Sequence, residues 1–255
     1  MNTDTAIILA AGYGSRLDAD ASHKLLVSIG GRPLLEHHAR NFARLGIRRL
    51  IVVTGYRGDD LQQAVDDVEV PEPISIECVH NSNFDAGNGH SVLAGARALD
   101  DGGSSAPFFL TMSDHIYEPG LFDDISRQFP DGLDGDCDGA LFVDRKLETI
   151  FDMPDATKLR FESPVAIGKQ LDDFDAVDTG LFWCRRPFVD ALQSALDNRG
   201  DCSTSDSVRT LHDADRFRFI DVGDRLWQDV DTAGARRHAE YLWDCDFEPG
   251  EINTE

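Results

Sequence analysis

The chain has 255 residues, 41% of them hydrophobic, and this length suits one large α/β domain, with or without a small appendage. Its net charge of −23, from 47 acidic and 24 basic residues, argues against binding to nucleic acid or to anionic membranes. No apolar run is long enough to span a membrane, the N-terminus has no basic, apolar leader, and the five cysteines include no Cys-x-x-Cys pair, so we expect a cytoplasmic protein with free thiols.

The first predicted element is a strand at residues 7–11, an apolar run of the kind that is buried on both faces of a parallel sheet. A helix is expected at 33–45, because proline favours the first helical turn and Gly46 is a stop signal. Strands and helices alternate up to Tyr117, which predicts a parallel sheet with helices on both faces. The other elements expected in this half are strands at 49–54, 74–79 and 107–112 and helices at 58–67 and 91–99.

After Tyr117 the alternation is less regular. Residues 131–139, rich in glycine and aspartate, are expected to form an exposed loop. The expected elements of this half are strands at 140–143, 157–161, 165–167, 177–184 and 217–222 and helices at 187–196, 205–211 and 233–243. The whole pattern predicts an α/β fold with a doubly wound, mostly parallel, Rossmann-like sheet and a small added sheet that is partly antiparallel.

The loop after the first strand suits a polyphosphate. Gly12 and Gly14 allow the backbone to wrap phosphates and offer N–H donors, while Arg16 and Lys24 add positive charge on either side. A dinucleotide fingerprint would need a third glycine where Leu17 stands, and the Gly-Lys-Ser/Thr of a Walker A loop is absent. A glycine turn that merely ends a strand would explain neither of the two cations.

Three aspartates are candidate ligands for Mg²⁺, which prefers one or two carboxylates together with phosphate oxygens. Asp114 follows a buried strand at the end where parallel sheets place their ligands. Asp229 and Asp231 alternate, so in an extended segment they point the same way, one to bind metal and the other to cap the helix after Thr232. The spacing leaves open which does which. His115 is expected to pack or to orient a phosphate rather than to bind metal.

The segment from Asp85 through Gly87 and Gly89 is expected to open a helix from a glycine turn, which presents N–H groups to a ligand in the loop. A carboxylate at Asp85 can accept a hydrogen bond from the amino group of cytosine, whereas it would repel the carbonyl oxygen that uracil has there. The alternative for Asp85 is a solvated loop acid, which is common in a chain this acidic.

Seven motifs occur in one order over almost the whole chain, and together they resemble those of the CTP:inositol-1-phosphate cytidylyltransferases, in the sugar-phosphate nucleotidyltransferase superfamily. The first is Leu-Ala-Ala-Gly-x-Gly-x-Arg-Leu with a downstream lysine, although His23 stands where the family usually has proline. The others are Gly-Asn-Gly-His-Ser at 87–91, Leu-Thr-Met-Ser-Asp-His at 110–115, Ala-Thr-Lys-Leu-Arg at 156–160, Ile-Gly-Lys at 167–169, Val-Asp-Thr-Gly at 177–180 and Leu-Trp-Gln-Asp-Val-Asp-Thr at 226–232.

The resemblance implies an Mg²⁺-dependent enzyme that transfers CMP from CTP to a phosphomonoester, inositol 1-phosphate, and yields CDP-inositol and pyrophosphate. It implies one domain over residues 1–255, with a nucleotide-binding half at 1–117, an acceptor-binding half at 118–244 and a polar tail at 245–255. Family members are often fused to a membrane phosphotransferase, and this chain is expected to be a stand-alone form.

The resemblance also implies roles for individual residues. Arg16, Lys24 and Lys169 are the expected catalytic cations, the first two on the leaving group and the third on the attacking monoester. Asp114 with Asp229 or Asp231 is the expected metal site. The nucleotide is expected to contact Leu9, Ala10, Ala11, Gly12, Gly14, Ser15, Asp85, Gly87 and Gly89, and the acceptor Arg145, Lys158 and Asp178.

Lysine is scarce in this chain. The four are Lys24, Lys146, Lys158 and Lys169; three fall in these motifs, which supports a functional use for them. The excess of acidic residues and the scarcity of lysine are similar to the surfaces of proteins from salt-loading halophiles, where molar salt screens self-repulsion.

Two other functions remain open from the sequence. A related enzyme would use another acceptor, such as phosphocholine or a hexose 1-phosphate, or another nucleotide. A nucleotide-sensing subunit would keep the fold without catalysis, but a mere binding module would not need both the carboxylates and the lysines. The oligomeric state stays open.

Overall fold

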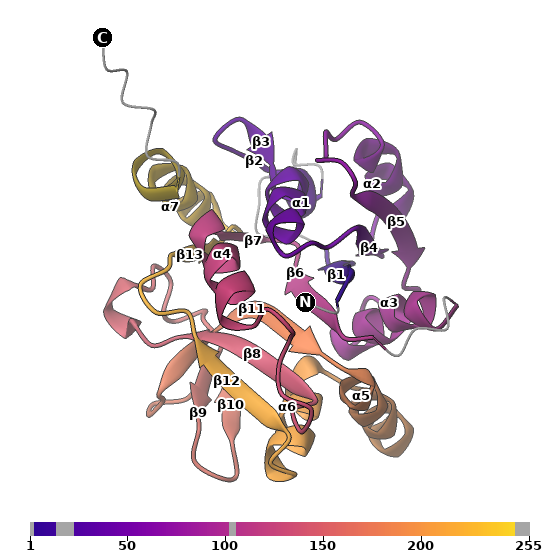
Figure 1. The fold of residues 1–255 in the computed structure, drawn as a ribbon, viewed down its shortest axis with the longest axis vertical. Coiled ribbons are helices and arrows are strands. Elements are labelled where there is room, and N and C mark those ends of the chain that lie inside the picture. The colour runs from indigo at the N-terminus through magenta and orange to yellow at the C-terminus, as the bar shows by residue number, and fades with distance from the viewer. Residues whose placement is uncertain (1–2, 14–22, 102–105, 248–255) are drawn as a thin grey trace.

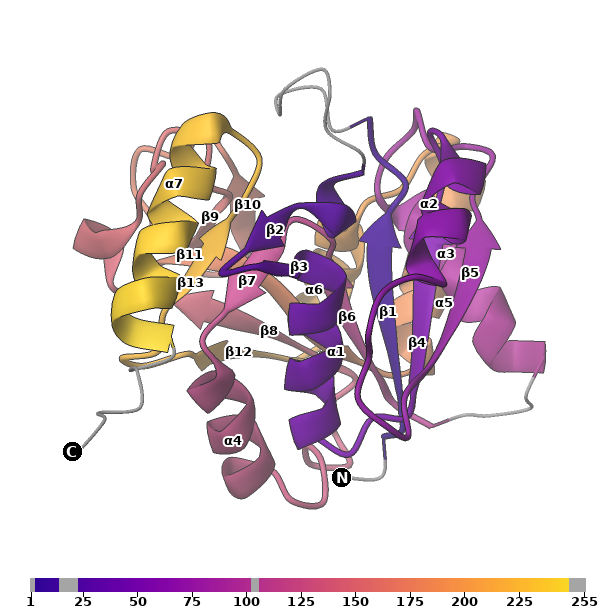
Figure 2. The ribbon, with the colours of Figure 1, turned by 90° about the horizontal axis from the view of Figure 1, so that it is seen from above.

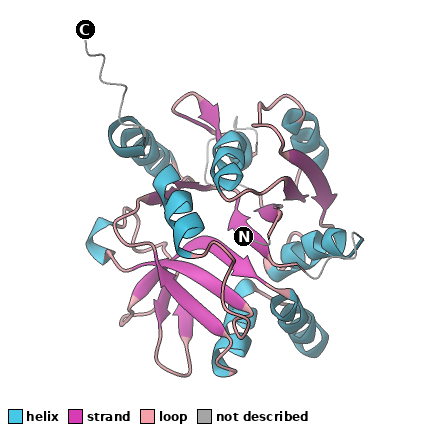
Figure 3. Ribbon diagram, viewed as in Figure 1, coloured by secondary structure: helices cyan, strands magenta, loops and turns pink. Residues whose placement is uncertain are grey.

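The structure is a computed structural model, and it describes residues 3–13, 23–101 and 106–247. Figure 3 shows its strands gathered into a central sheet that helices surround. One part of this sheet is parallel and consists of β1 (Thr5–Ala10), β4 (Arg49–Thr54), β5 (Ser75–His80) and β6 (Phe108–Met112). The other part adds β8 (Gly139–Asp144), β9 (Lys158–Arg160), β10 (Ala166–Gly168), β11 (Ala176–Cys184) and β12 (Phe217–Asp221).

The strand β11 joins the two parts. It pairs antiparallel with β6 and β9 along one edge and with β8 along the other, and the strand order is β10-β9-β11-β6-β1-β4-β5, with β8 off this path. The strand β8 also pairs with β12, in parallel. The α/β fold class is confirmed, and the antiparallel strands continue the same sheet across β11.

Helices cover both faces of the sheet (Figures 1 and 2). One face carries α1 (Leu34–Arg44), α2 (Gly58–Val65) and α4 (Pro119–Gln128). The other carries α3 (Gly89–Asp101), α5 (Arg186–Arg199) and α6 (Thr204–Asp213). Side chains of β1 alternate between these faces, because Ile8 packs toward α1 and Ile7 toward α3. The doubly wound arrangement therefore follows from a strand that is apolar on both sides.

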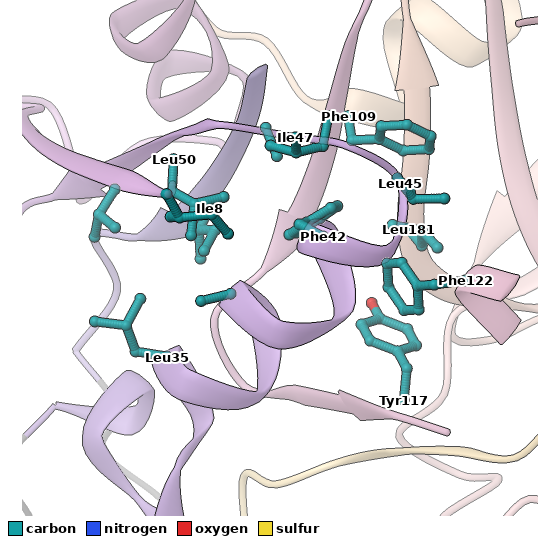
Figure 4. Close-up of a cluster of buried hydrophobic side chains, with 14 of the residues drawn as sticks. Ile8, Leu35, Phe42, Leu45, Ile47, Leu50, Phe109, Tyr117, Phe122 and Leu181 are labelled. Atoms are coloured by element: carbon teal, nitrogen blue, oxygen red, sulfur yellow. The ribbon is translucent and has the colours of Figure 1, made fainter. Parts of the chain in front are cut away.

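The core on the α1 face is built around aromatic rings (Figure 4). Phe42 of α1 meets Phe122 of α4 edge-on, with ring centroids 5.5 Å apart, and lies 6.0 Å from Phe109 of β6. Such pairs stabilise a core beyond the area they bury. They fix α4 against α1 and β6.

Two small sheets and a last helix lie beside the main sheet. The strands β7 (His115–Tyr117) and β13 (Trp227–Asp229) form one antiparallel pair, and β2 (Ser28–Ile29) and β3 (Arg32–Pro33) form the other. The helix α7 (Ala233–Leu242) packs on both pairs through a separate apolar cluster that includes Ile29, Ile116 and Leu242. This cluster holds β7 and β13 in place next to the ends of the parallel strands.

Some sequence-based boundaries differ from the structure. The strand expected at 7–11 begins at Thr5, and the helix α4 was not predicted at all. The loop expected at 131–139 is not wholly exposed, because Cys137 and Asp138 are buried and Gly139 begins β8. All five cysteines are free, as expected. None of the helices in the described part of the chain has the length and hydropathy needed to cross a bilayer.

Candidate active site

A cavity of about 730 Å³ opens at the carboxyl ends of β1 and β6. Segments beside both parts of the sheet line it. They are the turn after β1, the start of α3, the small β7–β13 pair and the segment at 149–157 that precedes β9. Ligands of open α/β sheets bind at this edge, where the strand direction changes.

Lys24 and Asp114 form an ion pair in the lining of the cavity. The Lys24 Nζ lies 2.6 Å from one carboxylate oxygen of Asp114 and 3.9 Å from Asp231. The Nδ1 of His115 lies 2.9 Å from the other oxygen of Asp114. Burial would raise the pKa of Asp114, but the hydrogen bond from His115 and the charges of His115 and Lys24 outweigh it and hold the pKa far below its usual value. Asp114 is therefore ionised at any physiological pH.

His115 is fixed by stacking and by charge. Its ring lies parallel to that of Trp227, at 4° and 5.6 Å, and it faces Asp229 in the β7–β13 register. Burial would lower the pKa of His115, but its hydrogen bond to Asp114 and the charges of Asp114, Asp229 and Asp178 raise it. The packing role expected for His115 agrees with this stacking.

Carboxylates crowd Asp229. Burial raises its pKa, and repulsion from Asp231, Asp114 and Asp152 adds to that effect, while His115 opposes it. A cation bound here would relieve this repulsion, so the residues present suit a divalent metal. In the described part of the chain, however, no three His, Cys, Asp or Glu side chains form a ready-made ligand set. One or two carboxylates completed by phosphate oxygens, as Mg²⁺ prefers, fit the site better.

The expectation that Asp229 or Asp231 caps the last helix is wrong. Thr232 is the N-cap of α7, and its hydroxyl accepts a hydrogen bond from the Ala235 N–H at 3.1 Å. Both aspartates line the cavity.

A bulge in β11 brings Asp178 into the cavity. The pairing register with β8 shifts between Asp178 and Phe182, and Gly180 has φ +74°. A side chain at Gly180 would lie 2.9 Å from the His115 ring, so only glycine fits here. The bulge is supported from below by Tyr117, whose hydroxyl donates to the Thr179 carbonyl oxygen at 2.9 Å.

The pKa of Asp178 is raised to about 6, chiefly by burial, while the hydrogen bond that it accepts from the Gly180 N–H and the charge of His115 act in the opposite direction. The native state therefore binds this proton more tightly than the unfolded chain does, and stability falls as pH rises from about 4 to about 6. We expect Asp178→Asn to raise the free energy of unfolding by about 1–3 kcal/mol at pH 7 and to leave it nearly unchanged at pH 4. Denaturant titrations at both pH values test this, with the exposed Asp172→Asn as control; an equal effect at both would contradict it.

The expected acceptor residues separate in the structure. Lys169 lines the cavity and pairs with Asp155 at 2.7 Å. Lys158 is buried, and its ammonium group donates to the main-chain oxygen of Lys169 at 2.6 Å. Arg145 is exposed and lies over the Phe161 ring, 5.6 Å from its centroid. The described lining includes Lys169 and Asp178 but neither Lys158 nor Arg145.

The glycine turn expected to read the base is bonded elsewhere in the protein. The Gly87 N–H donates to the Asp201 carboxylate at 3.0 Å, and the Gly89 N–H donates to the Cys202 carbonyl oxygen at 3.1 Å. A side chain at either glycine would collide with the Cys202 main chain. Asp85 is exposed, accepts a hydrogen bond from the Tyr13 hydroxyl, and is not part of the described lining.

The first part of the phosphate loop does line the cavity, with Leu9, Ala10, Ala11 and Gly12. The site predictions for Gly14, Ser15 and Arg16 concern positions outside the described residues. His23, the departure from the motif, also lines the cavity, and its Nε2 lies 2.9 Å from the Arg57 carbonyl oxygen.

Sequence reasoning missed Asp144. It is buried at the end of β8, lines the cavity, and accepts hydrogen bonds from the Trp227 indole at 2.9 Å and from Lys146 at 2.9 Å. The signal was an acidic residue that ends an apolar strand, as Asp114 follows β6. Lys146 therefore has a structural role, since its ammonium group also donates to the Gly223 and Arg225 carbonyl oxygens.

The sequence and the fold of this chain are both similar to those of known proteins. Two curated relatives, each called bifunctional IPC transferase and DIPP synthase, are 30% identical over 93% of this chain (Rubrobacter xylanophilus) and 32% identical over 91% (Thermococcus kodakarensis), covering 51% and 49% of the relatives. The chain thus spans about half the length of these relatives.

The fold is that of the solved inositol-1-phosphate CTP transferase from T. maritima, at a TM-score of 0.75 and 22% identity over 95% of this chain and 96% of that one. The predicted nucleotidyltransferase fold is therefore confirmed. The model of the MobA-like NTP transferase domain matches residues 6–201, well over half of the chain. The chain belongs to the family of MobA-like NTP transferase domains.

Proposed function

We propose that this protein transfers CMP from CTP to inositol 1-phosphate and releases pyrophosphate. The observation that carries the proposal is that one cavity of about 730 Å³ is lined by the glycine turn after β1, by Lys24, Asp114 and Asp229, and by Lys169 and Asp178. The name of the T. maritima neighbour supports the choice of CTP and inositol 1-phosphate. The Lys169 ammonium supports a phosphorylated acceptor at the far end.

In this proposal Mg²⁺ is held by Asp114 together with Asp229 or Asp231, and it supplies neutralisation of phosphate charge. Lys24 lies between Asp114 and Asp231 and steadies the triphosphate with positive charge. Lys169 contacts the acceptor phosphate in this proposal. Lys158 positions Lys169, because the Lys158 ammonium group donates a hydrogen bond to the Lys169 carbonyl oxygen. The proposed transfer needs no covalent nucleophile from the protein, because positioning and charge supply most of the catalysis in phosphoryl transfer.

A pyrophosphate-release screen tests the proposal. The purified protein is incubated with each of the four ribonucleoside triphosphates and a panel of phosphomonoesters that includes inositol 1-phosphate, phosphocholine and hexose 1-phosphates. The expected result is release that needs both CTP and inositol 1-phosphate and that stops on chelation of the metal. Release with another pair would replace the substrates but keep the reaction class, and binding without release would favour a sensor.

The proposal also keeps the division of the chain at Tyr117 into a nucleotide-binding and an acceptor-binding half within one domain, and a cytoplasmic location. The lining of the cavity supports the division into two halves, because Ala11 and Gly12 belong to the first half and Lys169 and Asp178 to the second.

The net charge of −23 predicts that salt stabilises the fold. Raising KCl from dilute to molar shortens the screening length to about 3 Å and relieves repulsion among the carboxylates. We therefore expect the melting temperature to rise steadily with KCl. Thermal unfolding followed in KCl and in choline chloride at equal ionic strength separates screening from a specific effect of potassium. A melting temperature that is flat or falls with salt would contradict the halophilic interpretation.

A further inference from the structure

Three aromatic side chains meet beside the turn that follows β1, next to the cavity. Tyr13 follows β1, Tyr56 follows β4 and Phe84 follows β5, so each comes from the carboxyl end of a parallel strand. The Tyr13 ring centroid lies 4.9 Å from that of Tyr56 and 5.6 Å from that of Phe84, and the latter two lie 6.5 Å apart. These three side chains are called the aromatic cluster below.

The aromatic cluster is both exposed and joined to the cavity. Tyr13 is 52% exposed and Tyr56 41%, and they are two of the four large apolar side chains that are exposed in the described part of the chain. Phe84 lines the cavity, as Gly12 does. Burying two such rings against the protein would be favourable, so their exposure beside a ligand cavity indicates a surface that a ligand covers.

The backbone is shaped to bring Phe84 to this place. A side chain at Gly55 would lie 2.6 Å from the Ala11 carbonyl oxygen and 2.6 Å from the Phe84 Cβ. The Tyr56 N–H donates to the same Ala11 oxygen at 3.0 Å. Glycine at position 55 therefore allows the turn that carries Phe84 to close directly on the end of β1.

Asp85 acts on the aromatic cluster as well. Its carboxylate accepts a hydrogen bond from the Tyr13 hydroxyl, and this bond raises the pKa of Tyr13. A carboxylate engaged in this way orients the Tyr13 ring. It ties the turn after β1 to the turn after β5.

We propose that the aromatic cluster is the surface on which the nucleobase of the triphosphate stacks, with Asp85 as the positioning residue for Tyr13. The proposal rests on the function proposed above. It differs from direct reading of cytosine by Asp85, because every base has a π face and stacking tolerates all of them. The aromatic cluster therefore supplies affinity for the base, and the choice between CTP and UTP falls to other groups.

Inorganic tripolyphosphate, which has no base, separates the two ends of the nucleotide. Dissociation constants for CTP, UTP and tripolyphosphate are measured by calorimetry for the wild-type protein and for Tyr13→Ala, Tyr56→Ala and Asp85→Asn. We expect Tyr13→Ala to weaken CTP and UTP by roughly 5- to 100-fold each and to leave tripolyphosphate unchanged. Asp85→Asn should weaken CTP and UTP by one common factor. The control is Tyr241→Ala, because Tyr241 is also an exposed tyrosine, 61% exposed, but lies on α7. This variant should bind all three ligands like the wild type.

Other results would overturn the proposal. Unchanged CTP binding in Tyr13→Ala, or an equal loss of tripolyphosphate, would make the cluster a structural support of the loop. A changed CTP-to-UTP ratio in Asp85→Asn with unchanged total affinity would assign Asp85 to direct base reading. If the tyrosine variants lose CTP binding but the wild type releases no pyrophosphate with any acceptor, the aromatic cluster stands and the proposed reaction fails.

Discussion

Replacing Asp114 with Asn should lower kcat by a factor of roughly 10²–10³ and leave the fold intact. Asp114 lies 2.6 Å from Lys24 and 2.9 Å from His115, so its negative charge positions both side chains. Asparagine keeps the shape and can still accept one hydrogen bond, but it removes the charge that a divalent metal needs. The loss should appear in kcat at saturating nucleotide, because the charge acts on the phosphates during transfer.

Steady-state pyrophosphate release measures this effect, and the exposed Asp173→Asn is the matched control. The histidine resonances of the same variant give a second readout. The pKa of His115 is raised partly by its hydrogen bond to Asp114, so it should fall in Asp114→Asn. Turnover near the wild-type value, or full activity after chelation of the metal, would remove Asp114 from the proposed metal site.

Lys24→Ala should lower kcat/KM by a factor on the order of 10² and also reduce stability. Lys24 and Asp114 are both mostly buried, with 18% and 20% of their side chains exposed, so removal of the ammonium leaves a carboxylate without its partner. Asp231, 3.9 Å away, loses a neighbouring cation as well. We expect a loss of about 1–3 kcal/mol in the free energy of unfolding, reduced from the value for a fully buried pair because water still reaches the site.

A double-mutant cycle with Asp114→Asn separates the two effects of Lys24. Denaturant unfolding should show that Lys24→Ala costs less stability when position 114 is already Asn, because no unpaired carboxylate remains. Activity should not return in the double variant. Lys146→Ala is the control lysine: it also pairs with an aspartate, at 2.9 Å, but its ammonium group donates to the Gly223 carbonyl oxygen and Lys146 is not part of the described lining of the cavity. Equal stability losses in both backgrounds would mean that Lys24 and Asp114 do not interact.

The sheet was predictable where one strand carries its own signal. The run after Thr5 is apolar at every position and so is the run Leu50–Val53 within β4, so burial on both faces followed directly. The helix α4 was missed although Pro119 lies in its first turn and Leu121 and Ile125 are four residues apart. Its apolar stripe is short, and its stability depends on Phe122 meeting Phe42 of α1, a contact that no local pattern reveals.

The centre of the site was predictable because its motifs report chemistry that short segments carry. Lys24, Asp114 and Asp229 line one cavity as the motifs implied. The residues around this centre were not predictable, because contacts between distant segments decide which of their atoms can bind a ligand. Lys158 is in β9 and pairs with Gly168 of β10, next to Lys169. Only the fold determines that the Lys158 ammonium group binds the Lys169 carbonyl oxygen.

The role of Gly87 and Gly89 as base contacts stays a prediction, because the sequence does not show which groups their N–H donors contact. Their N–H groups bond to Asp201 and Cys202, more than a hundred residues away. A glycine pattern indicates close backbone approach, but it does not identify the approaching group. Here the glycines admit another part of the chain.

The shared strand β11 has a consequence for how substrates enter and products leave. Residues Leu181–Cys184 pair with β6, while Ala176 and Val177 pair with β9, so one continuous backbone belongs to both sides of the cavity. A hinge that opened the two sides like jaws would have to break this ladder. We therefore expect opening to be confined to lining segments outside the sheet, such as 149–157, and their motion would limit the rate if release of product is slow.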